Sequence, residues 1–149
     1  MTAMPGPDPT VRPYEPRDRA RVLELAKDPR AIDSPGHRII VAEASAALAL
    51  WVRPDAGDEG ELGPVIAPAG DRRLFYRLVE RACRQAIDEG LERGTFTLSD
   101  ERLLRLLQRE FRIEPQASGW EPATGRPVRW DVHVDLRDAL RQLQEVLRG

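Results

Sequence analysis

The strongest constraint on the fold is a long amphipathic segment with a β-prone segment on either side. In residues 71–89, apolar side chains recur every three and four positions, which is typical of a helix with one buried face. Residues 61–67 before it and 94–98 after it have the composition of strands. Strand, helix and strand in this order form a βαβ unit, so we expect two parallel neighbouring strands. The apolar stripe consists of Leu74, Phe75, Leu78, Val79, Ala82, Cys83, Ala86 and Ile87.

The remaining segments predict an α+β fold with a mixed sheet. A strand, a helix and a hairpin precede the βαβ unit, and a helix, two strands and a last helix follow it. Antiparallel hairpins on both sides of a parallel crossover require one sheet of mixed direction. The expected elements are a strand at 10–14, a helix from 15, strands at 38–43 and 46–52, a helix at 101–109, strands from 111 and at 128–134, and a helix from 135.

Three residues around the βαβ unit predict local geometry. Gly63 and Pro64 interrupt the strand at 61–67 and indicate a bulge, because neither suits an ordinary central ladder. Asp71 stands directly before the long helix, where its carboxylate can accept a hydrogen bond from a free backbone N–H. We therefore expect an irregular strand followed by a capped helix.

Composition excludes several classes of protein. The chain has 149 residues, enough for one domain. Lys and Arg number 23 against 25 Asp and Glu, which argues against a nucleic-acid or anionic-membrane binder. Cys83 is the single cysteine, and the two histidines, His37 and His133, lack metal-ligand spacing, so we expect no internal disulfide and no metal site. There is no apolar run of about 18 residues, and residues 1–9 resemble a disordered leader and not a signal peptide, so we expect a cytoplasmic protein.

The order of elements resembles the GCN5-related N-acetyltransferase (GNAT) family. The stretch VRPYEPRD at 11–18 looks like that family's first strand and helix start, and ELGPVIAP at 61–68 is similar to its fourth strand. The stretch from Leu104 to Phe111 looks like its closing tyrosine–x–x–x–glycine–phenylalanine segment. The resemblance covers about residues 10–134. It implies a GNAT-like domain at 10–134 after the leader at 1–9, with an added helix at 135–149 that packs on the domain or on a dimer partner.

The resemblance also implies a reaction, in which acetyl-CoA donates an acyl group to an amine on a small molecule or a peptide. In GNAT enzymes the backbone of the fourth strand contacts the pantetheine arm, and backbone N–H groups before the long helix wrap the pyrophosphate. A glutamate on the fourth strand can take the proton of the amine, which implies Glu61 as the catalytic residue. The implied cofactor-binding residues are Val65, Ile66, Ala67, Gly70, Arg72 and Arg73.

The cofactor loop departs from the family's Gln/Arg-x-x-Gly-x-Gly/Ala pattern. Arg73 and Phe75 stand where the two glycines are expected, and only Gly70 remains. A side chain at those positions hinders close approach of the backbone to phosphate. As a helix cap, Asp71 would set a negative charge beside an anion. Arg72 and Arg73 can still reach phosphate with their side chains, so the pattern is degenerate.

Two further departures concern catalysis and leave two hypotheses. Leu106 stands where the family has a tyrosine that protonates the leaving thiolate, and Pro64 has no N–H for the pantetheine arm. The first hypothesis is an acyl-CoA-dependent N-acyltransferase with an open cleft beside residues 65–67. The second is a non-catalytic GNAT-like binding or assembly module that has lost CoA binding. Its cleft would be filled by side chains such as Phe75 and Arg73, and its last helix would serve in forming a homodimer.

Overall fold

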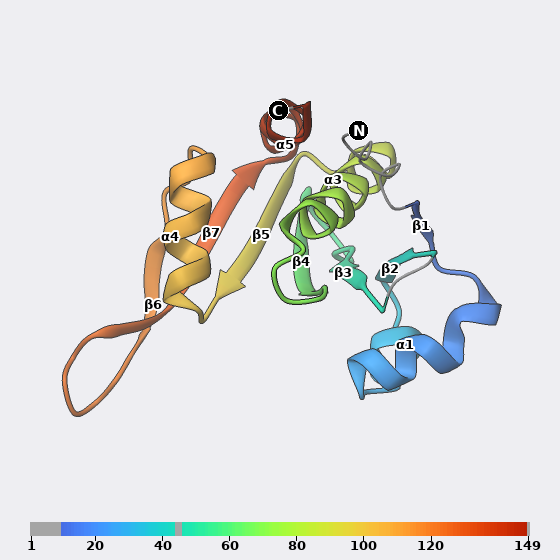
Figure 1. Cartoon of the computed structure of the whole chain (residues 1–149), viewed down its shortest axis with the longest axis horizontal. Helices are drawn as coiled ribbons and strands as arrows, with labels where there is room; N and C mark the ends of the chain where they lie inside the picture. The colour runs from blue at the N-terminus through green and yellow to red at the C-terminus, as the bar shows by residue number, and fades with distance from the viewer. Residues whose placement is uncertain (1–9, 44–45, 149) are drawn as a thin grey trace, which may run out of the picture.

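One mixed sheet runs through the molecule. The computed structural model describes residues 10–43 and 46–148, so the leader predicted at 1–9 lies outside the described residues. Seven strands among these residues follow the order β1-β2-β3-β4-β5-β7-β6. Among the described strands only the β4–β5 pair is parallel (Figure 1), which confirms the expected α+β class. The strands are β1 Val11–Pro13, β2 His37–Ala42, β3 Leu48–Val52, β4 Glu59–Ile66, β5 Arg93–Leu98, β6 Gln116–Trp120 and β7 Pro127–Asp135.

Helices cover the two faces of the sheet unequally. Side chains alternate along a strand, so Ile39 and Val41 of β2 pack with the first helices, whereas Ile40 and Ala42 belong to the larger core on the other face. That larger core also contains the apolar stripes of the three later helices. The described helices are the 3-10 helix η1 Pro16–Asp18, then α1 Arg19–Ala26, α2 Arg30–Asp33, α3 Arg72–Asp88, α4 Glu101–Glu110 and α5 Leu136–Arg148.

The segment after α4 differs from the sequence prediction. A strand was expected from Phe111, but β6 begins at Gln116. The backbone N–H of Phe111 donates to Leu107 at 2.8 Å and closes α4, and the N–H of Arg112 donates to the side chain of Gln142 at 2.8 Å. Because these donors are used by α4 and α5, they are not available to a sheet ladder.

The bulge expected in β4 is present. In the β3–β4 pairing, Ala49 lies opposite Val65, but Trp51 lies opposite Leu62, so β4 has one residue more than β3 over this stretch. The extra residue falls at Gly63–Pro64, a cis peptide bond, where Gly63 has φ +124°. A residue with a side chain rarely adopts that angle. The bulge locally breaks the regular pairing of β4 just before the chain turns toward α3.

Two leucine side chains lie very close to the backbone of the sheet where β4 and β5 pair. A Cβ atom on Gly60 would lie 2.9 Å from Leu91 Cδ1, and one on Gly94 would lie 3.0 Å from Leu136 Cδ2. These two glycines face each other in the parallel ladder. Leu136 begins α5 and Leu91 lies in the loop after α3, so the absence of side chains at this point lets both residues pack directly on the sheet.

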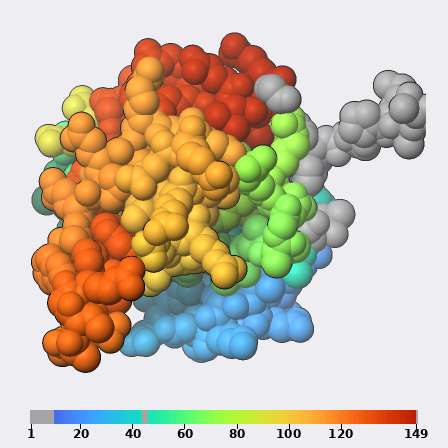
Figure 2. Space-filling view, turned by 60° about the vertical axis from the view of Figure 1, so that its left-hand side comes forward, coloured from blue at the N-terminus to red at the C-terminus, as the bar shows by residue number. Residues whose placement is uncertain are grey.

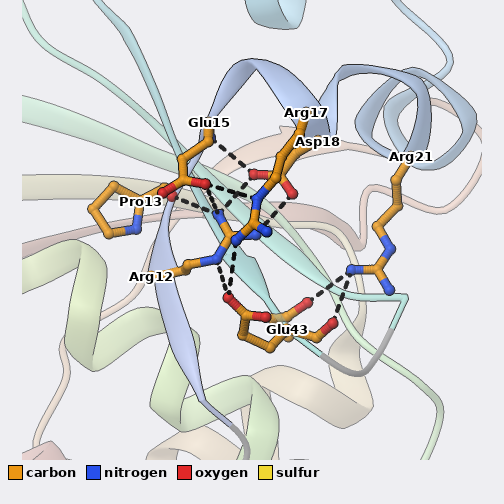
Figure 3. Close-up of polar contacts among 8 residues, drawn as sticks. Arg12, Pro13, Glu15, Arg17, Asp18, Arg21 and Glu43 are labelled. Atoms are coloured by element: carbon orange, nitrogen blue, oxygen red, sulfur yellow. Dashed lines mark hydrogen bonds and ion pairs between the residues drawn. The ribbon is translucent and has the colours of Figure 1, made fainter.

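An ion-pair network fastens the first strand to the first helix (Figure 3). Asp18 is buried, and its carboxylate accepts two hydrogen bonds from Arg12, at 2.7 and 2.8 Å, and one from the backbone N–H of Glu15 at 2.8 Å. Arg12 also pairs with Glu43 after β2. The hydrogen bonds from Arg12 lower the pKa of Asp18 to about 2. The Arg12 side chain therefore joins three segments, namely β1, η1 and the chain after β2.

Candidate functional site

The two central strands separate along their length, which opens a cleft. The parallel ladder joins β4 and β5 only at residues 59–61 and 93–95. Beyond these pairs each strand stays attached to its other neighbour, β4 to β3 and β5 to β7. The strands diverge after Glu61 and Thr95 (Figure 1). Their facing edges carry backbone N–H and C=O groups that the ladder does not pair, and these groups can bind a ligand with amide groups of its own.

A mostly apolar cavity of about 810 Å³ occupies this cleft. Its floor is formed by β4 and β5, and its walls by α3, α4 and α5. Phe75 lies in the wall, so the cavity stays open and Phe75 does not fill it. A volume of this size suits a small organic ligand. Apolar residues of the walls include Val65, Val79, Ala82, Phe96, Leu103, Leu107 and Leu143.

A row of polar side chains crosses the sheet where the strands separate. Glu61 pairs with Thr95, and Thr95 pairs with His133, so the three residues share one face of the sheet. Glu59 lies on the same face and its carboxylate is 3.3 Å from His133 Nδ1. Glu61 is exposed and also lines the cavity. An exposed carboxylate at this point can accept a proton from a group that enters from the polar face.

The first turn of α3 carries charges that already have partners. Asp71 caps the helix as expected, because its Oδ1 accepts the N–H of Leu74 at 3.1 Å. Arg72 forms an ion pair of 2.7 Å with Glu110 at the end of α4. A second cavity, of about 760 Å³, lies at this place. It is lined by Gly70, Asp71, Arg72, Arg73, Tyr76, Leu106, Glu110, Val146 and Leu147.

Tyr76 stands between the two cavities and lines both. Its ring packs edge-to-face against Phe111, with a centroid distance of 5.2 Å, and against Phe75 at 5.9 Å. The hydroxyl is buried and meets no partner at hydrogen-bond geometry among the described residues. Burial raises the pKa of Tyr76 above its usual value, and the nearby Glu110 adds to the rise. The phenol therefore stays protonated at neutral pH.

Cys83 and the potential metal ligands do not form a reactive or metal-binding site among the described residues. Burial raises the pKa of the Cys83 thiol to about 12, which leaves it without nucleophilic thiolate at neutral pH. Within residues 10–43 and 46–148, no group of His, Cys, Asp and Glu side chains is arranged to hold a metal ion. No helix in the same residues is long and apolar enough to cross a membrane.

The chain was compared with known proteins. No family model and no curated protein matches the sequence. Solved structures do match. A chimera of the Vibrio cholerae spermidine N-acetyltransferase and hSSAT has a TM-score of 0.64 and 16% identity, over 88% of this chain and 99% of that one. A Bacillus subtilis acetyltransferase in complex with CoA has a TM-score of 0.60 and 14% identity, over 86% of this chain and 99% of that one. The chain has the GNAT fold.

A third structure is a GNAT family acetyltransferase from Elizabethkingia anophelis with acetyl-CoA bound, with a TM-score of 0.57 and 15% identity, over 85% of this chain and 97% of that one. At such identities the likeness concerns the fold, and the activity of this chain has to be argued from its own residues.

The residues that the GNAT resemblance implied for cofactor binding lie in different parts of the structure. Val65 lines the cleft cavity together with Glu61. Ile66 packs on the opposite face of the sheet, in the smaller core with α1, and Ala67 packs against the larger core. Gly70, Arg72 and Arg73 line the second cavity at the start of α3. The predicted set therefore lies partly in the cleft, partly at the helix start and partly in the cores.

Several residues of the site were missed by the sequence reasoning. Thr95 and Glu59 join Glu61 and His133 only through the strand register, which depends on β7 inserting between β5 and β6. Glu110 lies far from Arg72 in the sequence and meets it because the end of α4 lies beside the first turn of α3. Nothing in a linear pattern carries these pairings. The capping signal at Asp71 was visible because a cap is a local feature.

Proposed function

We propose that the protein transfers an acyl group from a thioester donor to a primary amine. The observation that carries this proposal is the cavity between the diverging strands β4 and β5. Its apolar walls suit an acyl chain, and the unpaired strand edges suit the amide groups of a pantetheine arm. Acetyl-CoA is the donor that the GNAT fold suggests. The cytoplasmic location expected from the sequence is part of this proposal.

The proposal assigns separate sides of the sheet to the two substrates. The thioester lies in the cavity under α3 and α4, and the amine approaches from the polar face that carries Glu61, Thr95 and His133. Glu61 accepts the proton that the amine loses as it attacks the thioester carbon. The substrate is a primary amine on a small molecule or a peptide. The chain residues that bind it belong to this polar face.

The residues present fit a CoA donor at one end only. The acyl and pantetheine end matches the cavity, although Pro64 offers no N–H to it. The phosphate end meets the carboxylate of Asp71 and the ion pair between Arg72 and Glu110. The degenerate cofactor loop therefore restricts which thioester donor can bind.

The first test is a ligand-induced shift in the melting temperature, followed by transfer assays. A thioester that binds only the folded protein raises the Tm, by an amount equivalent to about 2.7 kcal/mol at a hundredfold excess over its Kd. With an amine found by screening, Glu61→Gln is expected to lower kcat about 100-fold. Glu121→Gln, at an exposed position just after β6, is the control and should retain most activity. Full activity of Glu61→Gln would remove Glu61 from the mechanism.

A second candidate function is a non-catalytic binding or assembly module. The capped start of α3, the Arg72–Glu110 pair and Leu106 in place of a tyrosine favour it. This candidate predicts no rise in Tm with any pantetheine thioester at millimolar concentration. It also predicts a homodimer, which size-exclusion chromatography with light-scattering detection would reveal as twice the mass of one chain. A monomer that binds thioesters would exclude it.

A further inference from the structure

The two ends of the cleft differ in what they can accept. The end between β4 and β5 is apolar and open, with unpaired backbone edges. The end at the start of α3 is the only place along this wall where a helix N-terminus points at the second cavity among the described residues. A helix N-terminus attracts anions through its free N–H groups and its dipole. Whether phosphate can bind therefore depends on this first turn.

A carboxylate already occupies the N-terminus of α3. Asp71 Oδ1 accepts the N–H of Leu74 at 3.1 Å, so one donor of the turn is used. The carboxylate places a negative charge where a diphosphate would need to lie, and the two anions would repel each other. The Asp71 carboxylate thus takes the position at the N-terminus of α3 in which a phosphate would bind.

A second carboxylate pairs with Arg72, one of the two arginines that line the second cavity. Glu110 pairs with Arg72 at 2.7 Å, and the Glu110 side chain is only 20% exposed. Its other oxygen, Oε2, is buried and has no hydrogen-bond partner among the described residues. A phosphate would have to displace Glu110 from Arg72 and leave that carboxylate in a poorly solvated position. Such displacement is costly, because a partly buried charge loses its compensation.

The seam between α3 and α4 is also closed by aromatic contacts. Tyr76 of α3 packs edge-to-face against Phe111 at the end of α4, with centroids 5.2 Å apart. In the space-filling view α4 (orange-yellow) lies against the green residues at the start of α3, beneath the red surface of α5 (Figure 2). If CoA were bound in the cleft and its nucleotide part extended between α3 and α4, the nucleotide would have to separate these contacts.

We propose that the acyl donor of this protein is a pantetheine thioester recognised without the 3′-phospho-ADP part of CoA. The inference rests on the proposed function and specifies its donor. The amine nitrogen forms a bond to the thioester carbon, the carbon–sulfur bond breaks, and pantetheine leaves as the thiol. The amine proton passes to Glu61, and the thiolate takes a proton from solvent. The thioester arm can belong to a small molecule or to a phosphopantetheine group on a carrier protein.

The experiment compares three ligands that share the arm: pantetheine, 4′-phosphopantetheine and CoA. Their Kd values are measured by calorimetry on the full chain, which needs no acceptor amine. Their S-acetyl forms are then compared by kcat/KM. We expect the Kd values of pantetheine and CoA to agree within about threefold. CoA binding more than 30-fold tighter than pantetheine would overturn this inference while leaving the proposed function intact.

The remaining outcomes distinguish failure of the proposed acyl transfer from failure of the donor inference. They also distinguish a small-molecule thioester from an arm carried on a protein. Binding by none of the three ligands would overturn both the proposed function and this inference. Equal binding by all three supports a small thioester as the donor. Phosphopantetheine binding tighter than both others supports an arm carried on a protein, because that arm bears a single phosphate.

Two variants test the physical cause. Asp71→Asn retains a good helix cap but removes the charge, and Glu110→Gln releases Arg72. Each is expected to tighten CoA binding about tenfold and to leave pantetheine binding unchanged. Glu101→Gln is the matched control on α4, where Glu101 pairs with Arg105 at the exposed surface. If CoA binding by the two variants equals that of the control, the carboxylates do not set donor choice.

Discussion

At the scale of single residues, Asp18 has the clearest energetic role. It is one of the few buried charged side chains among the described residues, and both of its oxygens accept hydrogen bonds from Arg12. Its pKa of about 2 lies below the ordinary value of 3.8. A depressed carboxyl pKa stabilises the folded state above the ordinary value, and this contribution is lost as the pH falls from about 4 to about 2.

We therefore expect Asp18→Asn to lower the free energy of unfolding at pH 7 by about 1–2 kcal/mol, after allowance for solvent near the pair. The difference between the variant and the parent should shrink as the pH falls below 4. Urea unfolding at a series of pH values measures it. Asp33→Asn is the control, because the Arg19–Asp33 pair is about half exposed and should contribute far less to the free energy of unfolding. A difference for Asp18→Asn that does not change with pH would contradict the pKa argument.

At the scale of elements, α5 is held by more than its apolar stripe. Gln142 is buried, accepts the backbone N–H of Arg112 at 2.8 Å and donates to Asp138 at 2.9 Å. The same helix packs along α3 and supplies walls to both cavities. Its docking therefore shapes the cleft, and it also fixes the chain after α4.

Gln142→Met keeps the side-chain volume but removes both hydrogen bonds. We expect it to lower the free energy of unfolding by about 1–2 kcal/mol, because the N–H of Arg112 is left without its partner. Gln144→Met makes the same change at a half-buried position on α5 and serves as the comparison in denaturant unfolding. Equal effects of the two substitutions would mean that Gln142 does not fasten α5.

The same helix explains why one element was predicted wrongly. Residues 111–114 have a strand-like pattern, but the N–H groups of Phe111 and Arg112 are used by α4 and by Gln142, and β6 starts later. Elements governed by local signals were predicted well. The stripe of α3, its cap at Asp71 and the bulge at Gly63–Pro64 depend on residues close in sequence. Contacts between distant elements, such as Arg72 with Glu110, are set by packing and cannot be read from a linear pattern.

At the scale of the whole molecule, the sheet order decides where the cleft lies. The sequence predicted parallel neighbours on either side of α3, and the structure confirms them as β4 and β5. It did not predict that they separate after three residue pairs, because the separation depends on β3 and β7 holding the outer edges. For the same reason Glu61 was a candidate from resemblance alone, while its row with Thr95 and His133 became visible only in the sheet.

The position of one tryptophan gives the cleft an optical property. Trp51 is only 2% exposed, lines the cleft cavity, and its indole N–H lies 3.4 Å from the side-chain oxygen of Gln85. Trp120, by contrast, is 56% exposed on β6, far along the sheet order from β3. Iodide in solution therefore quenches the emission of Trp120 and spares that of Trp51. The third tryptophan, Trp130, is half-buried on β7. In a variant carrying Trp120→Phe and Trp130→Phe, the tryptophan fluorescence comes from the cavity wall alone, so occupancy of the cleft can be followed without any attached dye.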